Sequence, residues 1–251
     1  IIEVLFMFPC TPLVVALTEK IIPGEDQKVH HNELQYITEI SLKSPATMIP
    51  QAKNELKRMA DMAQENLDRS IKGFLNQSDE YLNKIYHREE DINNVSHAIT
   101  DYLVKSNQLS LPLADQKILG SMFYVVNDIE RIGDHAENFA DYTKTELKHN
   151  TGLTGDAKEE IKKMYEAVSK LLKLSLESFM AQDGVNTQED KLAEIAALEA
   201  SIDKMERRYQ KHHIKRLAKG DCEPRAGLLF SDMLSELERI ADHSVNIAYS
   251  M

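Results

Sequence analysis

The chain has 251 residues and a net charge of −11 at pH 7. This charge argues against a nucleic-acid backbone as partner and suits cations or basic surfaces instead. Two cysteines, Cys10 and Cys222, are too few and too far apart for a disulfide framework or a zinc knuckle. With scarce Gly and Pro and no Trp, the composition favours helices in one large or two small domains.

The first residues differ from the rest of the chain. Residues 1–23 begin with a mostly apolar run that lacks the basic start of a signal peptide. Because a full membrane span needs about twenty apolar residues, we interpret 1–23 as the end of a transmembrane segment that starts upstream. The alternative is a core helix, which Pro9 and Pro12 disfavour. Residues 24–49 are polar and broken by prolines, so we predict a linker.

From residue 50 onward, apolar side chains recur every three or four positions, which is typical of amphipathic helices. The predicted helices cover residues 51–77, 79–105, 112–149, 156–182, 187–219 and 224 to the C-terminus. Three long helices joined by short loops in each half predict an all-α fold with a tandem pair of antiparallel three-helix bundles, 50–150 and 151–251.

A polar block occurs twice. The sequence DIERIGDHAEN at 128–138 recurs as ELERIADHSVN at 236–246. Subtracting 130 from 238 gives an offset of 108 residues, which also pairs Asp134 with Asp242. A polar block of this length does not recur by chance, so the chain is an internal duplication.

The block forms an oxygen-rich stripe on a helix. Residues four apart drift by only about 40° per step, so Glu130, Asp134 and Asn138 lie nearly in line. Gly133 and Ala136 lie about a quarter-turn away and allow a neighbouring helix to approach closely. The second copy repeats this arrangement, and its stripe contains Glu238, Asp242 and Asn246.

Two carboxylates four residues apart repel each other and need compensation. On an ordinary solvated face, the compensating positive charge could come from Arg131, Arg239 or a lysine on a neighbouring helix. A bound cation held by carboxylate and amide oxygens is the alternative, and the duplication favours it. His135 and His243 lie about 100° further round the helix and are less suitable ligands.

The middle helix of each half offers a matching acidic pair. Glu199 and Asp203 stand four apart in the second half, and Glu89 and Asn93 hold the corresponding positions in the first. If the middle and last helices pack antiparallel, the oxygen rows face each other and could hold one or several cations. Asn93 removes a charge, so we predict a weaker or differently loaded first site. An exposed acidic face is the alternative interpretation.

These features together resemble the PhoU domain, a family of tandem three-helix bundles linked to the control of phosphate uptake. The resemblance covers about residues 50–251 and depends on the paired ERIGDH and ERIADH blocks, each with an acidic pair upstream. It implies multinuclear clusters of divalent or trivalent metal ions, with iron or zinc expected. Carried over by position, the implied ligands are Glu89, Glu130, Asp134, Asn138, Glu199, Asp203, Glu238, Asp242 and Asn246.

The N-terminal part is similar to the junction in bacterial sodium/phosphate cotransporters, in which a membrane domain precedes a cytoplasmic PhoU-like domain. The similarity consists of the apolar run, the polar linker and the sequence LKSPATM at 42–48. It implies a regulatory, metal-binding domain of a sodium-dependent phosphate symporter. The expected partners are the upstream transporter domain, phosphate and sodium. The expected location is the cell membrane, with this portion on the cytoplasmic side.

Two other functions stay open from the sequence. One is a free-standing PhoU-type regulator that acts on a transporter or a sensor kinase, which also leaves room for a homodimer. The other is a di-iron oxidase, but such enzymes have a His three residues after a Glu, whereas His135 follows Asp134 directly. No phosphate loop or nucleophile–base pattern is present, so we predict a protein that is not an enzyme.

Overall fold

The computed structural model describes residues 34–38, 45–149, 153–181 and 185–250. The chain divides into two compact units, 1–33 and 34–251, and every described residue belongs to the second. The predicted transmembrane end at 1–23 lies outside the described residues. No helix in the described ranges is long and apolar enough to cross a membrane.

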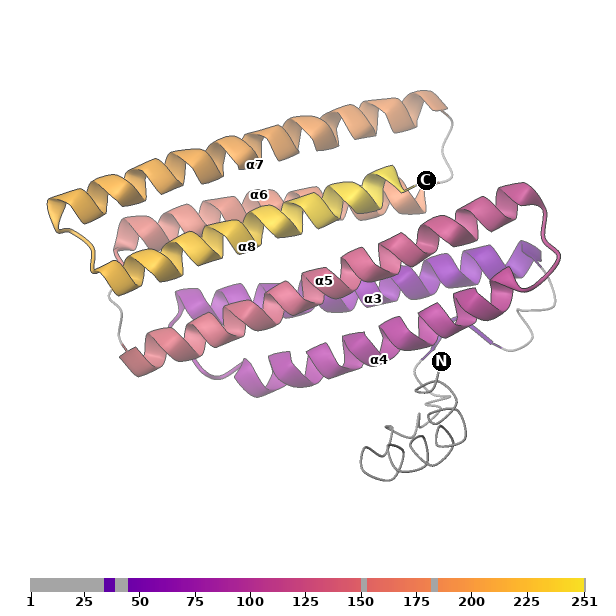
Figure 1. The fold of residues 1–251 in the computed structure, drawn as a ribbon, viewed down its shortest axis with the longest axis horizontal. Helices are drawn as coiled ribbons and strands as arrows, with labels where there is room; N and C mark the ends of the chain where they lie inside the picture. The colour runs from indigo at the N-terminus through magenta and orange to yellow at the C-terminus, as the bar shows by residue number, and fades with distance from the viewer. Residues whose placement is uncertain (1–33, 39–44, 150–152, 182–184, 251) are drawn as a thin grey trace, which may run out of the picture. The chain divides into compact units, whose positions relative to one another are not determined.

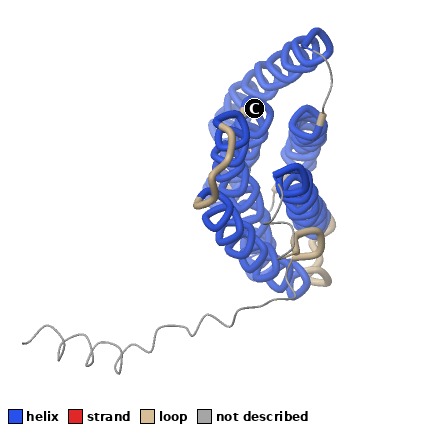
Figure 2. The backbone as a smooth tube through the Cα atoms, turned by 90° about the vertical axis from the view of Figure 1, so that its right-hand side faces the viewer, coloured by secondary structure: helices blue, strands red, loops and turns tan. Residues whose placement is uncertain are grey.

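Six helices make up the described part, which contains no strand (Figure 2). They are α3 (Pro45–Leu75), α4 (Leu82–Asn107), α5 (Leu113–His149), α6 (Gly155–Met180), α7 (Val185–Lys219) and α8 (Pro224–Tyr249). Each one matches a helix predicted from the periodicity, with ends shifted by a few residues. The all-α prediction is therefore confirmed.

The apolar stripes of these helices form the core. On α3, Leu56, Met59, Leu67 and Phe74 are each 0% exposed, as their successive spacings of three, eight and seven residues predict for one helix face. The other helices bury equivalent residues, including a phenylalanine on each of α5, α6 and α8. Burial of these stripes, more than helix propensity, stabilises helices of this kind.

Local sequence signals set the helix ends. The Thr154 side chain accepts a hydrogen bond from the Ala157 N–H (3.2 Å) and caps α6. Pro224 begins α8, as predicted. A proline is well tolerated in the first turn, because the N–H group that it lacks would have no hydrogen-bond partner within the helix there. α3 begins at Pro45, inside the predicted linker, and continues through Pro50. Met48 is fully buried between these prolines, so core packing favours the earlier start.

The helices form two three-helix sets, α3–α5 and α6–α8, and the two sets pack together through α5 with α8 and α3 with α6. Figure 1 shows α5 and α8 side by side at the middle, with α4 and α7 at the outer edges. We call α3–α5 the first repeat and α6–α8 the second repeat. The duplicated polar block lies on α5 and α8. Each of these two helices thus contacts its own repeat on one side and the other repeat on a different side.

Candidate metal centres and the contact between the repeats

The first acidic cluster joins α4 to α5 and consists of Glu89, Glu130, Asp134 and Glu137. Glu89 lies on the face of α4 that packs against α5, and the three α5 carboxylates lie close enough to repel its charge. Ser96 on α4 donates a hydrogen bond to Glu130 Oε2 (3.3 Å). The structure therefore brings the acidic rows of the middle and last helices together.

Glu89 is the most unusual member. It is 3% exposed, and neither of its carboxylate oxygens has a hydrogen-bond partner among the described residues. Burial, together with repulsion from Asp134, Glu137 and Glu130, raises the pKa of Glu89 to about 8. The Asn93 side-chain amide lies close enough to favour the charged form, but it makes no hydrogen bond of ordinary geometry with Glu89. A buried carboxylate with so weak a donor is costly, so we expect a proton or a cation to neutralise it.

Gly133 makes room for this carboxylate. A Cβ atom at Gly133 would lie 2.7 Å from Glu89 Oε2 and 3.3 Å from Ile92 Cγ2. No side chain fits there without displacing Glu89. The close approach expected at Gly133 is thus present, and it places an acidic side chain in the space that the glycine leaves.

The second acidic cluster joins α7 to α8. Burial and mutual repulsion raise the pKa values of Glu199, Glu238 and Asp242. For Glu238 the repelling groups are Asp242, Glu206 and Asp203, in that order. These five carboxylates are all at least partly exposed, unlike Glu89. The cluster therefore concentrates negative charge in contact with water.

Arginines neutralise only part of this charge. Arg131 lies 3.2 Å from Asp134, and Arg207 lies 3.4 Å from Asp203, each on the same helix as its partner. Both pairs are well exposed, where an ion pair contributes little. Among the described residues, no Lys or Arg lies within ion-pair distance of Glu89. The solvated-face interpretation thus fits the rim of each cluster and fails for Glu89.

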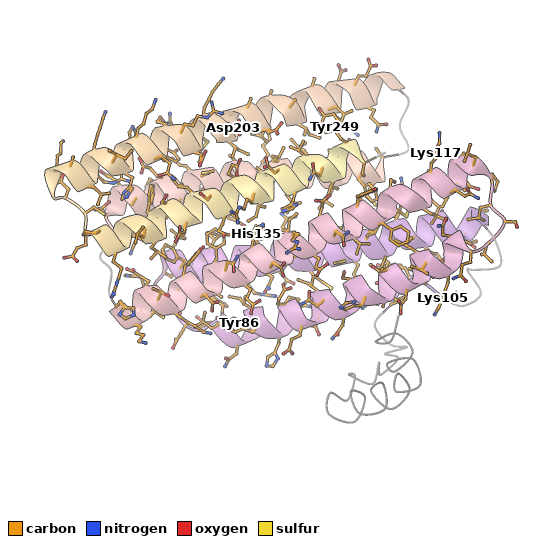
Figure 3. All side chains as sticks on the ribbon, in the orientation of Figure 1. Tyr86, Lys105, Lys117, His135, Asp203 and Tyr249 are labelled. Atoms are coloured by element: carbon orange, nitrogen blue, oxygen red, sulfur yellow. The ribbon has the colours of Figure 1, made fainter. Side chains whose placement is uncertain are left out.

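The histidines of the block contact the other repeat. His135 Nδ1 on α5 hydrogen-bonds Glu236 on α8, and His243 Nδ1 on α8 lies 2.8 Å from Asp128 Oδ1 on α5. The two imidazole rings are 5.5 Å apart between centroids. The 108-residue offset maps each pair onto the other, so the contact has an approximate twofold axis. Figure 3 labels His135 on α5, beside α8. We call these two contacts the histidine–carboxylate pairs.

Asn138 and Asn246 belong to the same contact. Asn138 Nδ2 donates to Glu236 Oε2 (3.1 Å), and Asn246 Nδ2 donates to Asp128 Oδ1 (3.3 Å). The sequence predicts both amides on the acidic stripe as ligands, and the structure places their Nδ2 atoms at the contact between the repeats. Two steps of about 40° carry Asn138 about 80° round from Glu130, which brings it to the repeat contact.

Glu137 and Glu206 are cluster members that the ligand prediction omitted. Glu137 is three residues after Asp134, and Glu206 is three residues after Asp203. The helix geometry already predicts Glu137 within or beside the acidic stripe, but the predicted ligand set took only positions spaced four apart, although residues three apart share a helix face as well. The signal was therefore present in the sequence.

The donor chemistry of both clusters suits a hard or borderline cation. Carboxylate oxygens are the ligands that such ions take, and Glu89 offers two buried oxygens with no other partner among the described residues. In the described ranges, no three His, Cys, Asp or Glu side chains converge as metal ligands would. The residue types fit a metal, whereas their side-chain positions would have to adjust to it.

The chain belongs to the PhoU domain family, which it matches over residues 56–143 and 161–251. The two matched stretches correspond to the two repeats. Family membership confirms the resemblance that the duplicated block suggested.

Curated relatives and solved structures agree with this assignment. The chain is 20% identical to the phosphate-specific transport system accessory protein PhoU homolog 1 of Thermotoga maritima, over 78% of this chain and 82% of that protein. It is 23% identical to the PhoU homolog of Clostridium acetobutylicum, over 78% of this chain and 87% of that protein. PhoU from Pseudomonas aeruginosa has the same fold, with a TM-score of 0.73 at 20% identity, covering 82% of this chain and 96% of that one. The phosphate transport system regulatory protein PhoU from Streptococcus pneumoniae gives a TM-score of 0.71 at 20% identity, with coverages of 82% and 94%.

These comparisons correct one prediction and weaken another. The expected place in the cell membrane is contradicted, because the matched relatives are named as accessory proteins of phosphate transport systems and are covered along most of their length. The apolar start of the chain had suggested that place. A sodium symporter in the same polypeptide has no support among the relatives, and the regulator alternative agrees with them better.

Proposed function

We propose that the chain is a PhoU-type regulator of phosphate uptake that binds cations at its two acidic clusters. Its membership of the PhoU family and the names of its relatives support the regulatory role. The mode of action is interaction with a transport system or a sensor kinase rather than catalysis.

The observation that carries the cation site is the state of Glu89. A buried carboxylate beside three others, with only the Asn93 amide as a weak donor in the described part of the chain, needs a proton or a positive ion for its stabilisation. Glu89, Glu130 and Asp134 would hold a cation in the first repeat, and Glu199, Asp203, Glu238 and Asp242 would hold one in the second. Iron and zinc are the ions to test first, because both accept carboxylate ligands.

A cation would link α4 to α5 and α7 to α8. Its charge would remove the repulsion within each acidic cluster and would hold the outer helix of each repeat against the central one. The bound ion would thereby stiffen the surface that a transport partner contacts. Any position left open on the metal would give phosphate a place to bind, which offers a route to sensing.

Metal analysis of protein purified without chelators tests the site. We expect metal bound to the unmodified chain and little bound to an Asp134→Ala/Asp242→Ala double variant. Asp115→Ala/Asp221→Ala is a matched control, since it removes two carboxylates that lie outside both clusters. Equal metal in all three proteins would remove the cation from the proposal.

Uptake of radiolabelled phosphate tests the regulatory role. We expect cells that lack their own PhoU protein to take up phosphate at an altered rate, and expression of this chain to restore it. The double cluster variant should restore it less well. Pull-down with purified transporter subunits and with the sensor kinase, separately, would then distinguish the two partners. Failure to change uptake and to bind either partner would reject the regulatory role.

A further inference from the structure

We propose that the histidine–carboxylate pairs are positioning elements that couple the two acidic clusters, so that loading one cluster with metal changes the affinity of the other. The inference rests on the proposed cation binding. It assigns a role to His135, His243, Asp128 and Glu236, which the cation sites themselves do not use.

The pairs are built to hold two helices in a fixed relation. His135 and Glu236 are 7% and 8% exposed. Glu236 also accepts hydrogen bonds from Asn138 and, at 3.4 Å, from the Tyr142 hydroxyl. Three side chains of α5 therefore hold the Glu236 carboxylate of α8 in place.

Each pair stands directly beside a cluster at both of its ends. His135 follows Asp134 of the first cluster, and its partner Glu236 is two residues before Glu238 of the second. The reverse path runs from Asp242 through His243 to Asp128, two residues before Glu130. Each path between the clusters thus consists of residues one or two positions apart on long helices and one side-chain contact, which is buried for His135 with Glu236 and partly exposed for His243 with Asp128.

Shared helices give the coupling its physical basis. Repulsion within the first cluster pushes α5 away from α4, and repulsion within the second pushes α8 away from α7. α5 and α8 also contact each other through the histidine–carboxylate pairs. A cation that holds α5 against α4 will therefore also fix the position of α8, because α8 contacts α5. The position of α8 in turn sets how the carboxylates of α7 and α8 approach each other. The coupling is positive, and it is reciprocal because binding free energies are linked.

The experiment is calorimetric titration of the full chain with Zn²⁺ alone, in buffer without phosphate or chelator. Asp134→Asn disables the first cluster and Asp242→Asn the second, so each single variant reports the affinity of the remaining cluster. For each cluster we compare two zinc affinities, one measured with the other cluster intact and one with the other cluster disabled. The first affinity divided by the second measures the coupling. We expect this affinity ratio to be about 5 or more when the histidine–carboxylate pairs are intact. In a His135→Gln/His243→Gln background, the ratio should fall toward one while both clusters still bind zinc.

Two controls isolate the pairs. His87→Gln/His97→Gln removes two exposed histidines of α4 and should leave the ratio unchanged. Asp128→Asn/Glu236→Gln removes the charged partners instead and should lower the ratio, which gives an independent test if the histidine variant does not fold by circular dichroism. Zinc binding with a ratio near one in the unmodified chain overturns the inference, and so does a ratio that stays as high in both pair-disrupting backgrounds as in the unmodified chain. Absence of zinc binding in every protein would instead reject the proposed cation sites themselves.

Discussion

The two acidic clusters occupy equivalent places in the two repeats but differ in burial. Glu89 is 3% exposed, whereas Glu199, its counterpart at an offset of 110 (199 − 89), is partly exposed. Gly133 leaves space for the Glu89 carboxylate, and the equivalent residue on α8 is Ala241, which carries a methyl group. The buried carboxylate of the first repeat thus lies beside a glycine, and the position equivalent to that glycine in the second repeat is an alanine.

The clusters also differ in charge. Asn93 and Ser96 in the first repeat correspond to Asp203 and Glu206 in the second. The first cluster therefore has fewer carboxylates, and at neutral pH a proton on Glu89 neutralises one of these. A cation must displace that proton to bind, which makes loading of the first cluster depend more strongly on pH. Duplication has produced two sites with different conditions for occupancy.

The largest expected effect is the pH dependence of the metal-free protein. The ordinary pKa of 4.5 applies to Glu89 in the unfolded chain, and about 8 applies in the folded protein. Between these values the folded state keeps a proton that the unfolded state has released. The free energy of unfolding should therefore fall with rising pH, by about 1.4 kcal/mol per pH unit from this group alone.

Urea unfolding at about pH 5.5, 6.5 and 7.5, with chelator present, measures this slope. Glu89→Gln should remove most of it, because glutamine does not titrate. Glu199→Gln is the matched control in the other repeat and should keep most of the slope. A slope that is the same in both variants would show that the two clusters do not differ as described.

Burial is the part of this comparison that the sequence could not supply. The periodicity of apolar residues sufficed for six helices and the tandem repeats, since each helix buries its own stripe. The spacing of Glu130 and Asp134 placed them on one face. The buried state of Glu89 depends on a contact between α4 and α5, and neither helix contains that information alone. The same holds for Asn138, whose partner Glu236 is 98 residues away.

Asn93→Asp should make the first cluster more like the second. An additional carboxylate beside Glu89 will increase repulsion, so the metal-free protein should lose about 1–2 kcal/mol of unfolding free energy. The same change should strengthen metal binding at the first cluster, because it adds a charged ligand. Urea unfolding without metal and zinc titration with metal measure the two effects. A variant that is destabilised but binds zinc no better would place Asn93 outside the cation site.

Exchanging the glycine and the alanine tests the role of the missing Cβ atom. Gly133→Ala should displace Glu89 toward water and reduce the pH slope, despite the better helix propensity of alanine. Ala241→Gly should cost about 1 kcal/mol through propensity alone and should leave that slope intact. Urea unfolding over the same pH series measures both. An unchanged slope in Gly133→Ala would mean that Ile92 rather than Glu89 yields to the new methyl group.

The smallest expected effects concern the arginines at the rim of each cluster. Arg131 and Arg207 are 65% and 72% exposed at the side chain, and their partners Asp134 and Asp203 are 39% and 41% exposed. Water and salt screen such pairs, so Arg131→Ala and Arg207→Ala should each change the unfolding free energy by less than about 1 kcal/mol. Both variants should bind zinc somewhat more tightly, because a competing positive charge has gone. If Arg131→Ala instead destabilises the metal-free protein strongly and does not improve zinc binding, the arginine is the resident counter-ion. The first cluster would then be an ordinary ion-paired face, with Glu89 kept neutral by its proton.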